Sequence, residues 1–467
     1  MTQLSTAFQT LSVASVGALA LLLAHLLANL QCSTELFGVR CLAYGTSLAG
    51  VITTLTHRAG LTAISQSIAL SSTAILATVC LAILLAFGKS ALVRAPLLVI
   101  STGAYLVAQV VSLIANGPLA QTGIEQIVSL LFLPGIVVYS AVLDVDEKEL
   151  LRVLRDLVNV GVAISVFLSI VSPDLAYDHD ATAIRRLPVF GLQWRLSGIM
   201  DHSNLLAFLA VVSIALNLFV RWRLGYVFVG LALVAIGLAE ARNAAITALI
   251  LLAFFFLKTG GSFWARTTFV FPIAGTSIYL LSSSSAFVNS TSTLSNDADT
   301  LDSRSKFWSI VFNQLPDRPL LGWGPLAFSK DSSSGFLATG FNDAHNEFVQ
   351  AVVEAGIVGL ALKVAFVLAL LASAARGRSR ILSLVLFAVS LLSMQTEVFF
   401  TLHLFGLSTA IIPALIIIVA LVGSSRRVFH NHQGITRVAL PPLWRSFQAS
   451  TEPSIAANSV RPLRPIQ

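Results

Sequence analysis

Long apolar runs alternate along this chain with short polar segments. A helix needs about 20 mostly apolar residues to cross the hydrocarbon core of a bilayer. The pattern therefore predicts an all-α, polytopic integral membrane protein with about 12 transmembrane helices. The predicted spans lie near residues 11–30, 66–88, 95–115, 123–143, 153–172, 203–220, 224–239, 243–257, 267–283, 350–373, 380–398 and 404–422.

A further apolar segment, residues 38–55, contains Arg40 and several small polar residues. It fits either a thirteenth span or a re-entrant piece. With twelve spans both ends of the chain are cytoplasmic, and a thirteenth would move the N-terminus outside.

Composition supports a membrane protein. Hydrophobic residues make up 56% of the chain and charged residues only 11%, whereas a soluble domain carries about a quarter charged residues. The net charge of +7 lies largely in membrane-flanking loops and in the tail, so it does not indicate a nucleic-acid partner. Three scattered cysteines form neither a disulfide framework nor a metal cluster.

Lysine and arginine in the short loops predict the orientation of the spans. Cytoplasmic loops are enriched in these residues, and alternating the spans places every basic cluster on that side. Two long loops, residues 173–202 and 284–344, then lie outside, the second of them before the last three helices. The clusters are Lys89/Arg94, Lys148/Arg152/Arg155, Arg221/Arg223, Lys258/Arg266, Arg376/Arg378/Arg380 and Arg426/Arg427.

This topology divides the chain into three parts. Residues 1–172 hold the N-terminal membrane helices, and residues 173–422 hold the later helices with both outer loops. Residues 423–467 form a basic tail rich in proline and serine, which we expect to be cytoplasmic and disordered.

One outer segment turns from polar to apolar within a few residues: DAHNEFVQAVVEAGIVGL, residues 343–360. Asp343 is a favourable N-cap, and a helix that begins there places Glu347, Gln350 and Glu354 on one polar stripe. An acid inside a membrane helix is costly unless it faces protein or water. We therefore expect the stripe to face a water-accessible cavity.

The same helix start would hold His345 in its first turn. Free backbone N–H groups and the helix dipole favour anions there, and a neutral imidazole can act as a base. The alternative is that His345 is an interfacial residue without a chemical role.

Three more polar segments lie on the predicted outer side. RLSGIMDHSN, residues 195–204, leads into a span, and AEARNA, residues 239–244, forms a hairpin between two spans. SRSKFWSIVFNQLPDRPLLGWG, residues 303–324, predicts an amphipathic helix and a tight turn. Its apolar residues would lie on the membrane or pack over the site.

The order of these motifs resembles the O-antigen ligase and polysaccharide polymerase superfamily, over roughly residues 195–422. The motifs are R-L-S-G-x-x-x-H-x-N, an outer A-R-N, R-x-x-x-W with P-L-L-G-W-G, and H-N-E-F-x-Q-x-x-x-E-x-G-x-x-G-L. The resemblance implies a glycosyltransferase of the bacterial cytoplasmic membrane whose active site faces the periplasm. Such enzymes transfer a glycan from undecaprenyl diphosphate to an acceptor hydroxyl, without a nucleotide sugar. The resemblance implies neither a metal nor a cofactor.

The resemblance also suggests roles for individual residues. His345 and Arg304 match the important histidine and arginine of the family, and Arg195 and Arg242 match arginines on the outer face. Ala241 stands where many relatives have serine, which weakens the match at Arg242. The predicted catalytic residues are His345, Glu347 and Glu354; the predicted diphosphate-binding residues are Arg195, Arg242, Arg304 and Arg318; Asn204, Asn346 and Gln350 support them.

The identity of the acceptor stays open. A second lipid-linked repeat would make the protein a polymerase of surface polysaccharide, which we favour slightly, and the lipid A core would make it an O-antigen ligase. A protein acceptor is a third option. A function of a different class, a multi-span transporter of a small anion, is a further alternative. The absence of charged residues in the middle of the spans argues against it.

Overall fold

The computed structural model divides the chain into two units, residues 1–426 and 427–467, and every described residue belongs to the first. The predicted spans 11–30, 267–283 and 404–422 lie wholly or almost wholly outside the described residues, as do segment 38–55 and tail 423–467. The described residues are 78, 80–116, 130–142, 147–178, 194–200, 202–220, 222–258, 301–325, 327–328, 336, 343–377, 379–395, 398 and 417.

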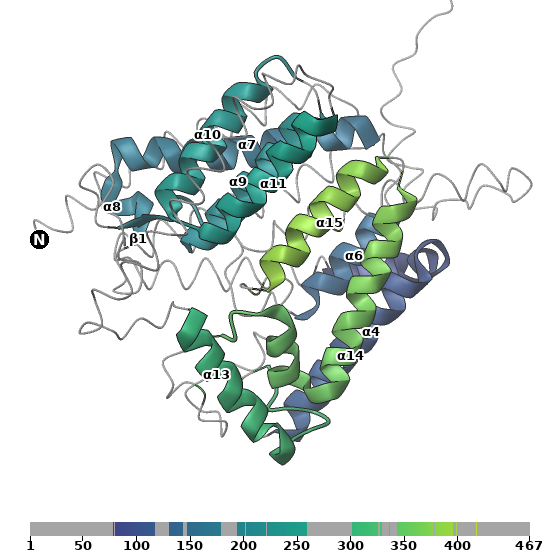
Figure 1. The fold of residues 1–467 in the computed structure, drawn as a ribbon. Coiled ribbons are helices and arrows are strands. Elements are labelled where there is room, and N and C mark those ends of the chain that lie inside the picture. Colours follow the sequence, from purple (N-terminus) through teal and green to yellow (C-terminus); the bar gives the residue numbers. More distant parts are fainter. Residues whose placement is uncertain are drawn as a thin grey trace, which may run out of the picture. The chain divides into compact units, whose positions relative to one another are not determined.

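The described part is mostly helical, as predicted (Figure 1). Among the described residues, three helices are long and apolar enough to cross a membrane: α4 (Pro96–Ala115), α7 (Glu147–Val171) and α14 (Glu347–Arg376). The total of 12 spans stays a prediction. The shorter apolar helices are α6 (Phe132–Val142), α9 (Ser203–Phe219), α10 (Gly225–Ala239), α11 (Arg242–Lys258) and α15 (Arg380–Met394).

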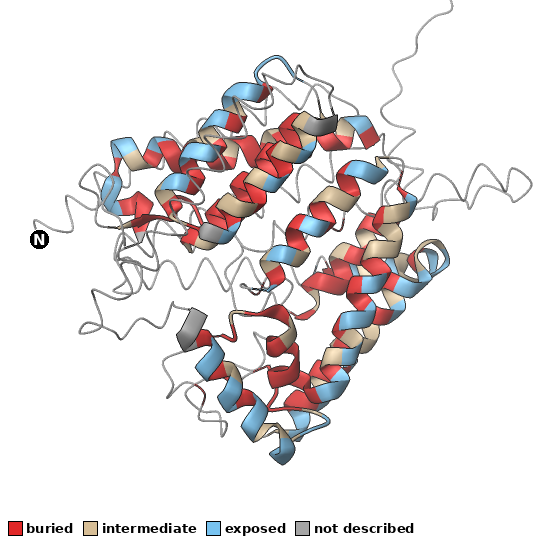
Figure 2. Cartoon of the chain, in the orientation of Figure 1, coloured by how far each residue is buried: buried red, intermediate tan, exposed pale blue. Residues whose placement is uncertain are grey.

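Helix α9 is the centre of the larger core. It is buried along nearly its whole length (Figure 2) and contacts α7, α10, α11 and α15. Helices α7 and α9 also share polar contacts: the Asn217 amide and the Ser213 hydroxyl both donate to Asn159 Oδ1 at 2.7 Å. Such interhelical hydrogen bonds join helices where both sides are otherwise apolar.

Loops predicted to be cytoplasmic lie together at one end of these helices. The backbone N–H of Ser379 donates to Glu147 at 2.8 Å, and the Arg155 guanidinium lies 4.5 Å from the centre of the Trp222 ring. The basic clusters around residues 148–155, 221–223 and 376–380 are therefore neighbours in the structure. This is consistent with the prediction that their loops lie on the same side of the membrane.

A small ladder departs from the all-α expectation. Strands β1 (Tyr177–Asp178) and β2 (Arg195–Leu196) pair antiparallel, after the short helix α8 (Pro173–Ala176). The ladder holds Arg195 opposite Asp178.

The long helix α14 is broken after its first two turns. Ala355 and Gly356 have non-helical backbone angles, and Gly356 has φ 61° and ψ −155°. We call residues 347–354 the short arm and residues 357–376 the long arm. The sequence predicted one continuous helix here, which is wrong.

The P-L-L-G-W-G turn fills the break. The N–H groups of Trp323 and Gly324 donate to the carbonyls of Val353 and Glu354 at 2.8 and 3.0 Å, and the N–H of Ile357 donates to the Pro319 carbonyl at 2.9 Å. Each contact uses a backbone group that the interrupted helix leaves without its usual partner. In a membrane such groups must be satisfied by protein, so the turn is a structural part of α14.

A second apolar core joins this region. Helix α13 (Leu301–Gln314), which leads through η4 (Leu315–Asp317) into the turn, buries Phe307 and Val311. They pack with Trp323, Phe328 and Phe336, and with the valines of the short arm. The apolar face of α13 therefore packs on the short arm, one of the two arrangements predicted for it.

The break in α14 should tolerate only glycine. A Cβ at Gly356 would overlap the backbone of Leu320 and Pro319, and its backbone angles suit glycine almost alone. We predict that Gly356→Ala lowers the free energy of unfolding in detergent by about 2 kcal/mol or more. Gly230→Ala on α10, where nothing lies within 4 Å of the new methyl, is the control. Equal melting temperatures for the two variants would contradict this role.

Candidate functional site

The segment before α14 forms a tight turn instead of the predicted first turn of a helix. Asp343 Oδ1 accepts the backbone N–H of His345 at 2.6 Å, and His345 has a left-handed backbone, with φ 48°. Asn346 is the N-cap, because its side chain accepts the N–H groups of Phe348 and Val349. The prediction that Asp343 caps the helix and His345 lies inside it is wrong; the helix begins at Glu347.

The His345 ring lies beside the Asp343 carboxylate. Its Nδ1 is 3.3 Å from Oδ1 of Asp343, and the two side chains are 21% and 10% exposed. The same oxygen accepts the backbone N–H of His345, so Asp343 contacts both the backbone and the ring of this residue. Sequence reasoning assigned Asp343 only a capping role and missed it as a neighbour of the histidine.

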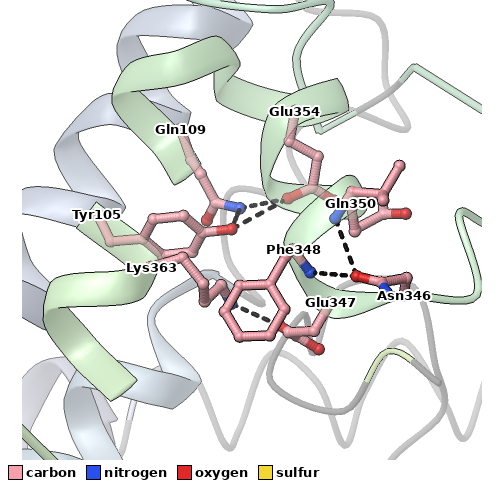
Figure 3. A network of polar contacts seen from close by, with 9 residues as sticks. Tyr105, Gln109, Asn346, Glu347, Phe348, Gln350, Glu354 and Lys363 are labelled. Atoms are coloured by element: carbon pink, nitrogen blue, oxygen red, sulfur yellow. Dashed lines mark hydrogen bonds and ion pairs between the residues drawn. The ribbon is translucent and has the colours of Figure 1, made fainter. Parts of the chain in front are cut away.

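The polar stripe of the short arm faces protein, contrary to the cavity that the sequence predicted. Glu347, Gln350 and Glu354 are fully buried. Glu354 accepts hydrogen bonds from the amides of Gln109 at 2.5 Å and Gln350 at 2.7 Å. Figure 3 shows Gln109 and Tyr105 reaching this carboxyl group from α4.

Glu347 has a different partner, on the long arm. Lys363 Nζ lies 2.5 Å from Glu347 Oε1 and 4.4 Å from the centre of the Tyr105 ring, and it is fully buried. Lys363 was missed, and the expectation of no charge in the middle of a span is wrong here. A lone lysine in an apolar run was the available signal.

Gln350 connects the stripe to the histidine turn. Its Oε1 accepts the backbone N–H of Ala344 at 2.8 Å, while its amide donates to Glu354. The Asn346 side chain donates to the carbonyl of Gln395, which follows α15, at 3.1 Å. The turn that carries His345 is thus held from two sides by helices of the bundle.

Arg195 and Asn204, both predicted site residues, contact each other. Arg195 donates to Asn204 Oδ1 at 2.6 Å and to the carbonyl of Ala239 at 2.9 Å, and it is 7% exposed. The AEARNA hairpin therefore lies next to Arg195. Arg242 begins α11 in this hairpin; its side chain is outside the described residues.

Arg304 and Arg318 lie at opposite ends of the α13 region. Arg304 is buried on α13, one turn before Trp308, whose indole N–H donates to the Ala344 carbonyl at 2.8 Å. Residues four apart share a helix face, so α13 presents Arg304 toward the segment that carries His345. Arg318 is half-buried and follows η4, next to the turn that fills the break.

The structure thus places Arg304 and His345 on segments that contact each other. It also places Arg195 in contact with Asn204 of α9 and with the end of α10. Glu347, Gln350 and Glu354 belong to a buried network between α4 and both arms of α14 (Figure 3). Within the described ranges, no group of three histidine, cysteine or acidic side chains could hold a metal ion.

Comparison with known proteins gives one family. Residues 227–364 match the model of the family described as O-antigen ligase. The match runs from α10 to the first half of the long arm, and it includes Arg242, Arg304, His345 and Lys363. No curated protein matches the chain. The resemblance seen in the motifs is confirmed over residues 227–364, the part of the chain that is similar to the O-antigen ligase family.

Proposed function

We propose that this protein transfers a glycan from undecaprenyl diphosphate to an acceptor hydroxyl at the outer face of the bacterial cytoplasmic membrane. The observation that carries the proposal is the turn at residues 343–346. It holds His345 beside Asp343 and lies against α13, which bears Arg304. The family supports the general activity, that of a membrane glycosyltransferase of the ligase or polymerase type.

The chemistry follows from the residues of this turn. The acceptor oxygen attacks the anomeric carbon, and its proton passes to the His345 imidazole, which acts as a general base. The bond from that carbon to the diphosphate breaks, and the lipid diphosphate leaves with the electron pair. Asp343 stabilises the imidazolium that forms, the role that an orienting carboxylate has in other catalytic pairs.

Arginine suits the leaving group. Its guanidinium forms paired hydrogen bonds with phosphate oxygens and keeps its charge. We favour Arg304 for this role, since α13, which bears it, contacts the histidine turn through Trp308. Arg195, Arg242 and Arg318 complete the predicted diphosphate site. Glu347 and Glu354 are committed to buried partners, so we now assign them to holding the short arm in place.

We favour polymerisation over ligation to lipid A core, and one assay separates the two. The purified protein receives its lipid-linked repeat unit alone, and the products are separated on a gel. A ladder of longer lipid-linked glycans establishes polymerisation. Turnover that requires added lipid A core establishes ligation.

Lys363 supports a second candidate, a transporter of a small anion, because buried charges in membrane helices often mark ion pathways. Its close pairing with Glu347 favours a structural role instead. Uptake of anions by proteoliposomes, in the absence of any glycan transfer, would favour the transporter.

His345 should be required for transfer but not for folding. We predict that His345→Asn lowers kcat by about 10²–10⁴-fold, the usual contribution of a general base. Asparagine tolerates the left-handed backbone at this position, so the variant should purify and melt like the wild type. Transfer at the wild-type rate would exclude His345 from the mechanism.

Asp343 should affect the rate through the histidine. Asn at position 343 keeps an oxygen for the His345 N–H but removes the charge beside the ring. We predict that Asp343→Asn lowers kcat about 10-fold or more, which is less than the loss when a triad aspartate is replaced. Initial rates at saturating donor measure this. An unchanged kcat would show that the carboxylate only shapes the turn.

Arg304 should be needed as arginine and not merely as a positive charge. We predict that Arg304→Lys lowers kcat/KM for the donor by about 10²-fold, comparable to the loss of one donor to a developing anion. Lys306→Ala, at an exposed position on the same helix, is the matched control and should keep wild-type kinetics. Equal rates for both variants would remove Arg304 from the diphosphate site.

A further inference from the structure

Lys363 is a fully buried lysine on the long arm of α14, seven residues beyond Gly356. It pairs with Glu347, the first residue of the short arm, and its ammonium lies over the Tyr105 ring. Glu347 follows His345 by two residues. The pair therefore connects the long arm directly to the segment that carries the histidine.

The pair requires the short arm to fold back along the long arm. Residues 16 positions apart in a continuous α-helix are separated by about 24 Å along the axis, far beyond the reach of a lysine and a glutamate. The break at Ala355–Gly356 removes this separation. Figure 3 shows Lys363 directed toward Glu347 across the space between the arms.

Helix α4 runs beside the long arm over the same interval and gives its length. The Ser112 hydroxyl donates to the Glu354 carbonyl at the break, at 2.7 Å, whereas Tyr105 lies at Lys363. Both intervals, from Ser112 to Tyr105 and from Gly356 to Lys363, are seven residues, or about 10 Å of helix. The start of the short arm therefore lies about 10 Å along the long arm from the break.

Burial of a charged pair is not explained by stability alone. Apolar residues of similar volume are often as stabilising as a buried ion pair, although loss of one partner is strongly destabilising. The ion pair and the contact with the Tyr105 ring fix the position of the short arm relative to the long arm. Packed apolar surfaces alone would allow the two arms to slide past each other. A position is valuable here, because a shift of about 1 Å in a reacting group can cost about 10²-fold in rate.

We propose that Lys363 is a positioning residue of the transfer reaction. Its pair with Glu347 holds the short arm against the long arm and so sets where His345 stands relative to the donor and the acceptor. The expected effect of Lys363 on the transfer rate rests on the proposed function. The folding back of the short arm on the long arm does not depend on that function.

The kinetic test compares four variants at saturating donor. Lys363→Met, and the double variant Glu347→Gln/Lys363→Met, which leaves no unpaired buried charge, should lower kcat about 10²-fold with little change in KM. Lys363→Arg should retain most of kcat. Lys148→Met removes an exposed lysine elsewhere and should match the wild type. A double variant with wild-type kcat would overturn the proposal, as would an equal loss in Lys363→Arg.

A second test reports the position without catalysis. Cys32, Cys41 and Cys80 are replaced by alanine, His345 is replaced by cysteine, and its reaction with a membrane-impermeant maleimide is timed in vesicles. Adding Glu347→Gln/Lys363→Met should change the labelling rate several-fold, because the turn is no longer held. An unchanged rate would overturn the role of the pair. A wild-type protein that transfers no glycan would defeat only the proposed function, since the labelling result still stands.

Discussion

The break in α14 is the feature on which the rest of the site depends. It leaves carbonyl and N–H groups without helical partners, and these groups are paired by the turn of residues 319–324 and by Ser112 of α4. In an apolar environment each unpaired group would cost several kcal/mol. The segment that contains α13 is therefore joined to α14 by backbone hydrogen bonds.

This attachment explains how distant motifs come together. Once the turn is fixed in the break, α13 packs on the valines of the short arm, and Trp308 reaches the Ala344 carbonyl. The same break lets the short arm return along the long arm, where Glu347 meets Lys363. The histidine turn consequently contacts α13 through Ala344, and it contacts the end of α15 through Asn346.

The division of the polar residues follows from their burial. Glu347 and Glu354 have close partners inside the protein, which fits residues that hold a structure in place. His345 and Asp343 lie on a partly exposed turn, which fits residues that meet a substrate. In our proposal, the motif H-N-E-F-x-Q-x-x-x-E combines two tasks at one helix start: its first residue takes part in the chemistry, and its later polar residues hold that first residue in position.

The sequence by itself determined the apolar helices, and its motifs indicated the family whose model residues 227–364 match. Runs such as residues 203–219 and 225–239 are helical because their apolar character is local and continuous, so α9 and α10 begin and end close to the predicted bounds. The motifs also gave His345 and Arg304 as candidate site residues. Only the tertiary structure decided that the helix begins at Glu347, that it breaks at Gly356 and that Lys363 pairs with Glu347. Each of these depends on groups that are distant in the chain, because a broken helix and a buried charge persist only where other segments supply their partners.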